Sequence, residues 1–111
     1  MDTISHDIFS RLDIRIGTIL SAERVPETDK LVKLSVDIGE ASPRTLVAGI
    51  AAFVPDVSSL VGAQIPILAN LEPRLLKGVE SQGMILAASD DEGGFSLLLP
   101  NMPIKNGARV K

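Results

Sequence analysis

The residues best suited to chemistry lie together in one polar segment, residues 70–84, which reads NLEPRLLKGVESQGM. The segment carries two cations, Arg74 and Lys77. It also carries side chains that form hydrogen bonds, namely Asn70, Ser81 and Gln82. Such groups bind the phosphates and sugars of a nucleic acid without reading its sequence. The segment joins two apolar runs and is too long for a tight hairpin, so we expect an RNA-contacting loop; the alternative is an ordinary connection with two solvated cations.

Small and flexible residues in the same segment fit close contact with a ligand. Gly78 and Gly83 would let an RNA backbone approach, because glycine has no side chain. Met84 would offer an adaptable apolar contact to a base or a ribose. The alternative for Met84 is core packing at the start of a strand.

Further cations extend the candidate patch over three predicted strands. Arg15 alternates with two isoleucines and is expected to point outward. The others are Lys30, Lys33 and Arg44. Acidic residues interleave with them, namely Asp13, Asp29 and Asp37. The sequence therefore predicts a modest positive patch.

Catalytic groups are scarce in this chain. His6 is the only histidine and lies near a terminus, and there is no cysteine. Ser-His or Cys-His nucleophiles and ordinary zinc sites are therefore not expected. The carboxylate pair Asp90–Asp91 lies in a predicted turn, and no phosphate-binding loop of the GxxxxGK[ST] type is present. We expect no enzyme activity from this chain, no metal and no cofactor.

Composition restricts the class of protein further. Of the 111 residues 45% are hydrophobic, which excludes a disordered chain. The net charge of -3 disfavours nucleic acid on charge alone, so an RNA surface would have to be local. Tyr and Trp are absent and only three Phe occur, too few for serial base stacking. No apolar run approaches the roughly 20 residues of a membrane span, and no signal peptide is recognisable. A cytoplasmic protein is the expectation.

Hydrophobic alternation predicts short strands. Strands are expected at residues 13–20, 32–38, 46–48, 64–71, 83–88 and 95–99, with a helix at 5–12, a helical turn at 56–60 and a hairpin turn at 90–94. The residues expected to point inward are Ile14, Ile16, Val32, Leu34, Val36, Leu46, Ile65, Ile67 and Ile85.

Five strands and a small helix fit an all-β OB-fold, a five-stranded Greek-key barrel, with the last strand and tail as an extension. Pattern alone leaves barrel against sandwich open. Nothing resembles a linker or a repeat, so residues 1–111 are expected to form one domain. In an OB-fold the loop before the last barrel strand, here residues 70–84, borders the oligonucleotide-binding face.

Three segments resemble the tRNA-binding domain family, which occurs at the C-terminus of methionyl-tRNA synthetases and in free-standing dimeric tRNA-binding proteins. The segments are residues 12–19 (LDIRIGTI), 26–31 (PETDKL) continuing into 34–39, and 70–74 (NLEPR) followed by 77–87. Residues 44–51 fit as well, so the resemblance covers essentially the whole chain. The Ser-x-Gly-Met stretch at Ser81–Met84 is its most specific part. The family usually has His where this chain has Val25.

The resemblance implies an OB-fold that contacts tRNA by shape and backbone, often near the elbow, with little sequence preference. The positions that contact RNA in the family correspond to Lys30, Asn70, Ser81 and Met84, with Arg15, Arg74 and Lys77 as neighbours. It also implies a homodimer joined through a C-terminal extension at about residues 95–111. The chain would be free-standing or part of methionyl-tRNA synthetase. The runner-up is a secretion-type chaperone of the same superfamily that binds unfolded polypeptide, and a purely structural dimerisation domain of a synthetase is a third reading.

Overall fold

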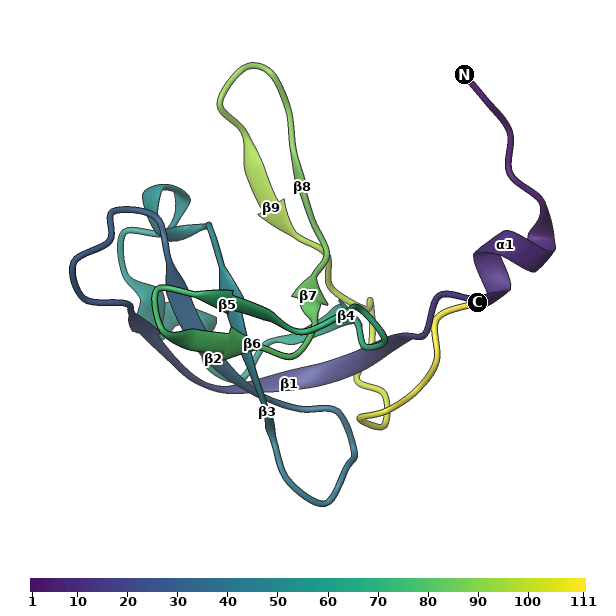
Figure 1. Cartoon of the computed structure of the whole chain (residues 1–111), viewed down its shortest axis with the longest axis horizontal. Coiled ribbons are helices and arrows are strands. Elements are labelled where there is room, and N and C mark those ends of the chain that lie inside the picture. Colours follow the sequence, from purple (N-terminus) through teal and green to yellow (C-terminus); the bar gives the residue numbers. More distant parts are fainter.

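The computed structural model describes all 111 residues and consists of short strands, one short α-helix and two 3-10 turns (Figure 1). The helix and turns are α1 (His6–Ser10), η1 (Ala51–Phe53) and η2 (Val57–Leu60). The strands are β1 (Ile14–Arg24), β2 (Val32–Asp37), β3 (Arg44–Ala48), β4 (Gln64–Leu68), β5 (Arg74–Leu76), β6 (Val79–Ser81), β7 (Met84–Ile85), β8 (Ala87–Ser89) and β9 (Phe95–Leu97).

Five strands form one antiparallel sheet in the order β3-β2-β1-β4-β7, which curls into a nearly closed barrel. The long strand β1 makes this possible because it pairs with two partners. Its first half pairs with β4 and its second half with β2. The register shifts between Ile19 and Ser21, and a bulge of this kind bends a strand. The predicted all-β OB-type barrel with a short N-terminal helix is confirmed.

The core follows the alternation of the sequence. Val32, Leu34 and Val36 on β2 are at most 1% exposed, while Lys33 and Ser35 between them face outward. All nine residues expected to point inward are buried, namely Ile14, Ile16, Val32, Leu34, Val36, Leu46, Ile65, Ile67 and Ile85. The predicted register is confirmed.

The predicted strand at residues 83–88 is wrong in its extent, since the chain leaves the barrel after two residues. Only Met84 and Ile85 pair with β4, and β8 then pairs with β9 in a separate hairpin. The turn of that hairpin is as predicted, because the Asp90 carboxylate accepts the backbone N–H groups of Glu92 and Gly94. Phe95 stacks on Phe53 of η1 with 4.8 Å between ring centroids, which fastens the hairpin to the barrel.

The C-terminal segment completes the sheet beside the first half of β1. Residues 107–110 exchange backbone hydrogen bonds with Ile14 and Ile16, at 2.8–2.9 Å. Asn106 fixes this segment because its side-chain oxygen accepts from Thr18 and Gln64. Gly107 touches the backbone so closely that an added Cβ would lie 2.8 Å from the Ile38 oxygen. Part of the expected extension is thus integral to the barrel.

The N-terminal helix projects from the barrel as an arm (Figure 1). Ser5 caps it as predicted, accepting the Ile8 N–H at 3.2 Å. No residue of the helix is buried, and Ile8, with Leu12 just after the helix, stays exposed. Phe9 is half-buried, and the Arg109 guanidinium donates to the Ser10 and Leu12 carbonyls, which ties the base of the arm to the C-terminal segment. No helix in the structure has the length and apolarity to cross a membrane.

Candidate nucleic-acid interface

Residues 70–84 contain a two-stranded hairpin, β5–β6, so the expectation that this segment is an open loop is wrong. Lys77 and Gly78 form its turn with φ angles of +50° and +81°. Positive φ at both central residues is the type I′ geometry, whose twist matches that of paired strands. Arg74 pairs with Ser81 and Leu76 with Val79. The hairpin therefore carries Arg74 and Lys77 on fixed backbone.

A set of hydrogen bonds between β3 and residues 81–82, here named the seam, closes the barrel and holds the hairpin. The Ser81 hydroxyl accepts the Val47 N–H at 2.9 Å and donates to the Gly83 carbonyl at 3.0 Å. Gln82 adds a backbone bond to the Thr45 carbonyl at 2.8 Å, and its side-chain oxygen accepts the Thr45 N–H at 3.0 Å. Side chains here take the place of strand pairing.

Ser81 was expected to contact RNA, but its side chain lies inside the barrel wall. Ser81 is only 5% exposed, and its hydroxyl both accepts one hydrogen bond and donates another within the barrel. Gly83 is also buried, and an added Cβ there would lie 2.9 Å from the Leu68 oxygen. Gly83 therefore permits close contact between strands rather than an approach by RNA.

Arg44 is also committed to internal contacts. Its guanidinium pairs with Glu40 at 2.8 Å and donates to the carbonyls of Ala69 and Gln82. The hydrogen bonds from Arg44 hold the pKa of the Glu40 carboxyl below its usual value, against the opposing effect of burial. Arg44 supports the seam and leaves little charge for a ligand.

Arg15 and Asn70 lie near this same end of the barrel, and both are occupied. Arg15 forms an ion pair with Asp13 at 2.8 Å, which lowers the pKa of the Asp13 carboxyl. The Asn70 amide accepts the Asp13 N–H at 2.9 Å and donates to the Arg11 carbonyl at 2.7 Å. Asn70 thereby ties the start of β1 to the end of β4.

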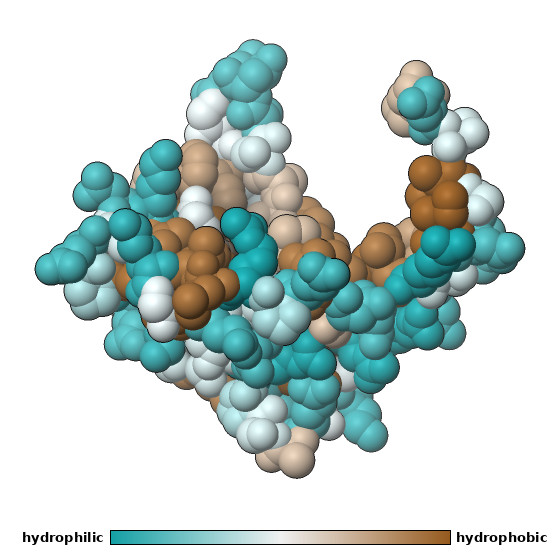
Figure 2. Space-filling view, in the orientation of Figure 1, coloured by the Kyte–Doolittle hydropathy of each residue, from teal (hydrophilic) through white to brown (hydrophobic).

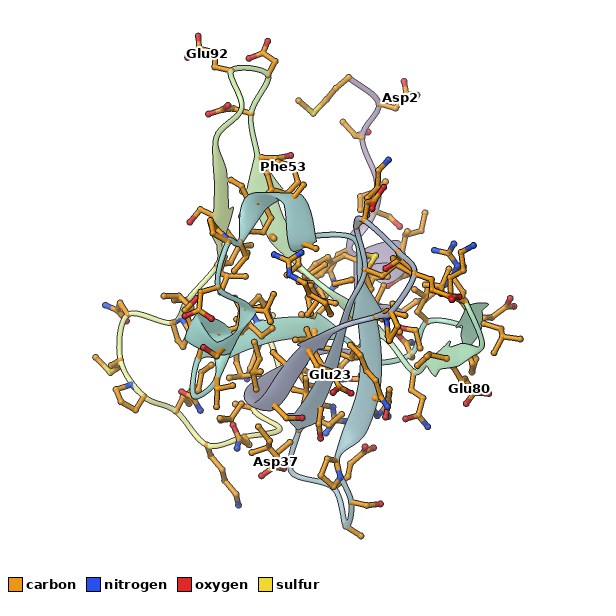
Figure 3. The ribbon with its side chains drawn as sticks, turned by 90° about the vertical axis from the view of Figure 1, so that its left-hand side faces the viewer. Asp2, Glu23, Asp37, Phe53, Glu80 and Glu92 are labelled. Carbon is orange, nitrogen blue, oxygen red and sulfur yellow. The ribbon has the colours of Figure 1, made fainter.

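Lys30 lies in the β1–β2 loop, which is folded against η1. The Lys30 carbonyl accepts the Ala51 N–H at 2.9 Å, and Val25 N–H donates to Leu31 across the loop. The Lys30 side chain is exposed and forms no ion pair. Figures 1 and 3 both show this loop on the same side of the barrel as the β5–β6 hairpin.

The outer surface of β2 and β3, with the β1–β2 loop and the β5–β6 hairpin beside it, is named here the binding face. A groove on this face lies between the hairpin and the strands, lined by Lys33 and Thr45 on the barrel side. Lys30, Arg74 and Lys77 contribute three exposed cations that form no ion pair. Lys33 is only weakly paired, 3.9 Å from Glu23.

Met84 is 44% exposed, so it is not a core residue. It lies at the rim of a small hollow of about 40 Å³. Leu71 and Arg74 line the same hollow, and Ser81 forms part of its wall. Of the seven predicted site residues, the structure brings Arg74, Ser81 and Met84 together here.

The barrel carries a cationic hairpin beside the face that OB-folds use for ligands. This arrangement is typical of small oligonucleotide-binding domains. Residues 14–109 match the family described as "Putative tRNA binding domain". The chain belongs to this tRNA-binding domain family.

Similar proteins agree with this assignment. The chain is 45% identical over 111 residues to methionine–tRNA ligase of Porphyromonas gingivalis, covering 99% of this chain and 16% of that protein. The solved structure of a MetRS-related protein from Pyrococcus horikoshii is 36% identical, with a TM-score of 0.92 and full coverage of both chains. The structure of the chaperone CsaA from Bacillus anthracis is 30% identical, with a TM-score of 0.87, over 99% of this chain and 100% of that one.

Proposed function

We propose that this domain holds tRNA on its binding face through a few phosphate contacts from Lys30, Arg74 and Lys77. The observation that carries the proposal is that these three exposed cations have no acidic partner, whereas Arg15 and Arg44 do. An unpaired cation can neutralise a phosphate without first losing an internal ion pair. The β1–β2 loop and the β5–β6 hairpin beside the same face supply them, as expected for an OB-fold ligand site.

Recognition by such contacts depends on the shape and backbone of the RNA. Phosphate contacts position an RNA but carry no sequence information, and folded RNA is recognised largely by shape. We therefore expect little discrimination among tRNA species. Met84 would add an apolar contact at the rim of the hollow.

Two of the other predicted contacts would act indirectly, and the third, Arg15, would first have to release its ion pair. The side chains of Asn70 and Ser81 form their hydrogen bonds within the barrel, so they would position the hairpin rather than bind RNA. Arg15 would have to exchange Asp13 for a phosphate in order to take part.

Filter binding with total tRNA across a salt series tests the proposal. Three contacts, with Arg15 as a possible fourth, give a log–log slope of roughly -2 to -4, since each contributes about 0.7 to 0.9. Lys30→Ala should weaken all tRNAs alike and flatten the slope by about one unit. A slope that does not change in this variant would exclude Lys30 from phosphate binding.

The domain would act without catalysis, as a binding module that is free-standing or appended to methionyl-tRNA synthetase. The chain corresponds to 16% of the length of its Porphyromonas gingivalis relative, so the activity of such an enzyme would reside elsewhere. Within the chain no three His, Cys, Asp or Glu side chains group to hold a metal ion.

We also propose a homodimer. The family resemblance implies an interface at about residues 95–111, and Leu98, Leu99 and Met102 in this range are exposed. Ile8 of α1 and Leu12 just after it are also exposed, and Figure 2 shows hydrophobic residues along the notch between this arm and the β8–β9 hairpin. A second copy would cover these groups. Sedimentation of the whole chain at micromolar concentration should give a dimer, and a monomer there would contradict the proposal.

A second candidate function, binding of unfolded polypeptide, is favoured by one observation. The chaperone CsaA from Bacillus anthracis has the same fold over the whole chain at 30% identity. Parallel titrations with tRNA and an unfolded polypeptide distinguish the two functions. Polypeptide binding without tRNA binding would favour the chaperone reading.

A further inference from the structure

We propose that Leu75 contacts a nucleobase face of the bound tRNA, so that the hairpin adds a salt-independent apolar contact to the phosphate contacts beside it. The inference rests on the proposed function and extends it to a residue outside the predicted site. It concerns the β5–β6 hairpin, on which Figure 2 shows apolar atoms gathered at the surface.

Most of the Leu75 side chain is in contact with solvent, so it contributes little to the stability of the fold. It is 74% exposed, more than any other large hydrophobic residue after Met1. Its cross-strand partner is Glu80, and Figure 3 shows Glu80 on the outer side of the hairpin. The flanking residues Arg74 and Leu76 lie on the opposite face, because successive side chains alternate along a strand. Leu75 therefore points away from the barrel.

The backbone that carries Leu75 is fixed. The type I′ turn at Lys77 and Gly78 sets the pairing of the two strands, and the seam holds the second strand through Ser81. A rigid backbone leaves only the side chain to be ordered in a complex, which lowers the entropy lost on binding. This is the arrangement expected of a contact residue rather than of a mobile loop tip.

Leu75 lies on the outer face of the hairpin, and the other face of the hairpin borders an apolar hollow. Leu71 and Met84 are 37% and 44% exposed, and both line the hollow that Arg74 also lines. Arg74 and Lys77, which form no ion pair, stand on either side of Leu75 in the sequence. Apolar side chains flanked by free cations suit a base whose neighbouring phosphates are bound, and apolar wedges against base steps are known in nucleic-acid recognition.

A duplex offers few open base faces, whereas folded RNA exposes unstacked bases in its loops and bends. Leu75 would therefore cover an unpaired or outermost base of the tRNA. Glu72 and Glu80 at the edge of the hairpin are exposed and would disfavour a close phosphate at those points, leaving the apolar patch to a base.

The test is the affinity of Leu75→Ala for total tRNA across a salt series. Loss of the side chain removes apolar contact area, so we expect about five- to tenfold weaker binding with an unchanged log–log slope. Leu20→Ala is the matched control, since Leu20 is an exposed leucine at 46% on β1. Leu20→Ala should bind as the unmodified protein does. Leu75→Met should recover most of the affinity, because a thioether adapts to a base face.

The outcomes separate this inference from the function on which it rests. Unchanged tRNA binding in Leu75→Ala, with weakened binding in Lys77→Ala, would overturn the base contact and keep the phosphate site. No tRNA binding by the unmodified protein would overturn both. A loss of unfolded-polypeptide binding in Leu75→Ala, with tRNA binding intact, would assign the patch to polypeptide.

Discussion

Replacing Ser81 with alanine should destabilise the fold as well as weaken tRNA binding. The substitution removes the acceptor of the Val47 N–H at 2.9 Å, in a place that is 5% exposed. A buried donor left without a partner costs about 1–3 kcal/mol. For a chain of this size each kcal/mol lowers the melting temperature by about 4 °C, so the expected fall is about 4–12 °C.

Thermal unfolding followed by circular dichroism measures this change, with Ser21→Ala as the control. Ser21 is exposed on β1 and its side chain makes no hydrogen bond, so its loss should leave the melting temperature within about 2 °C. A Ser81→Ala protein as stable as the unmodified protein, yet poor in tRNA binding, would refute the seam and restore Ser81 as a direct RNA contact.

Three further predictions concern stability. Leu34→Ala should lower the free energy of unfolding by roughly 2–5 kcal/mol, measured in urea, because the side chain is 1% exposed. Asp13 and Glu40 have pKa values below their ordinary 3.8 and 4.5, so their stabilisation is present above about pH 4.5 and is lost as the pH falls through the lowered values. Urea titrations at several pH values should show this loss, and it should be smaller in Asp13→Asn and Glu40→Gln; identical acid profiles would contradict it. Gly107→Ala should loosen the C-terminal segment, because an added Cβ would lie 2.8 Å from the Ile38 oxygen, and hydrogen exchange at the Val110 amide should then rise; unchanged exchange would argue against this close contact.

The strands with one buried face could be predicted from the sequence. On β2 the alternation of Val32, Leu34 and Val36 with polar residues set the register, because a slip by one residue would move all three into water. Ser5 and the turn at 90–94 were also predictable, since caps and turns depend on neighbouring residues only.

The β5–β6 hairpin could not be predicted in the same way. Its turn residues, Lys77 and Gly78, lack the Asn-Gly or Asp-Gly pair that marks a type I′ turn. The burial of Ser81 depends on β3, more than 30 residues earlier, which only the closed barrel brings beside it. The same holds for Asn106, whose partner Thr18 is 88 positions away.

The sequence predicted which residues belong to the candidate site, but it did not predict which of them are free to bind a ligand and which support the fold. All seven residues were named from the polar segment, the cations and the family resemblance, yet a sequence does not show which cation has an acidic partner. The structure pairs Arg15 with Asp13 and leaves Lys30, Arg74 and Lys77 unpaired. Leu75 gave no signal, since the sequence does not show which of the consecutive residues Leu75 and Leu76 is exposed.

The most direct test of the phosphate site is the affinity for total tRNA at low salt when Lys30, Arg74 and Lys77 are replaced together by alanine. The matched control replaces three other exposed cations, Arg11, Lys105 and Lys111, so that the change in net charge is the same. The first variant should lose nearly all affinity, and its log–log slope should flatten by roughly 2 to 3 units, while the control keeps both. If the first variant binds tRNA as tightly as the control does, the proposed phosphate site is wrong and polypeptide binding becomes the better reading.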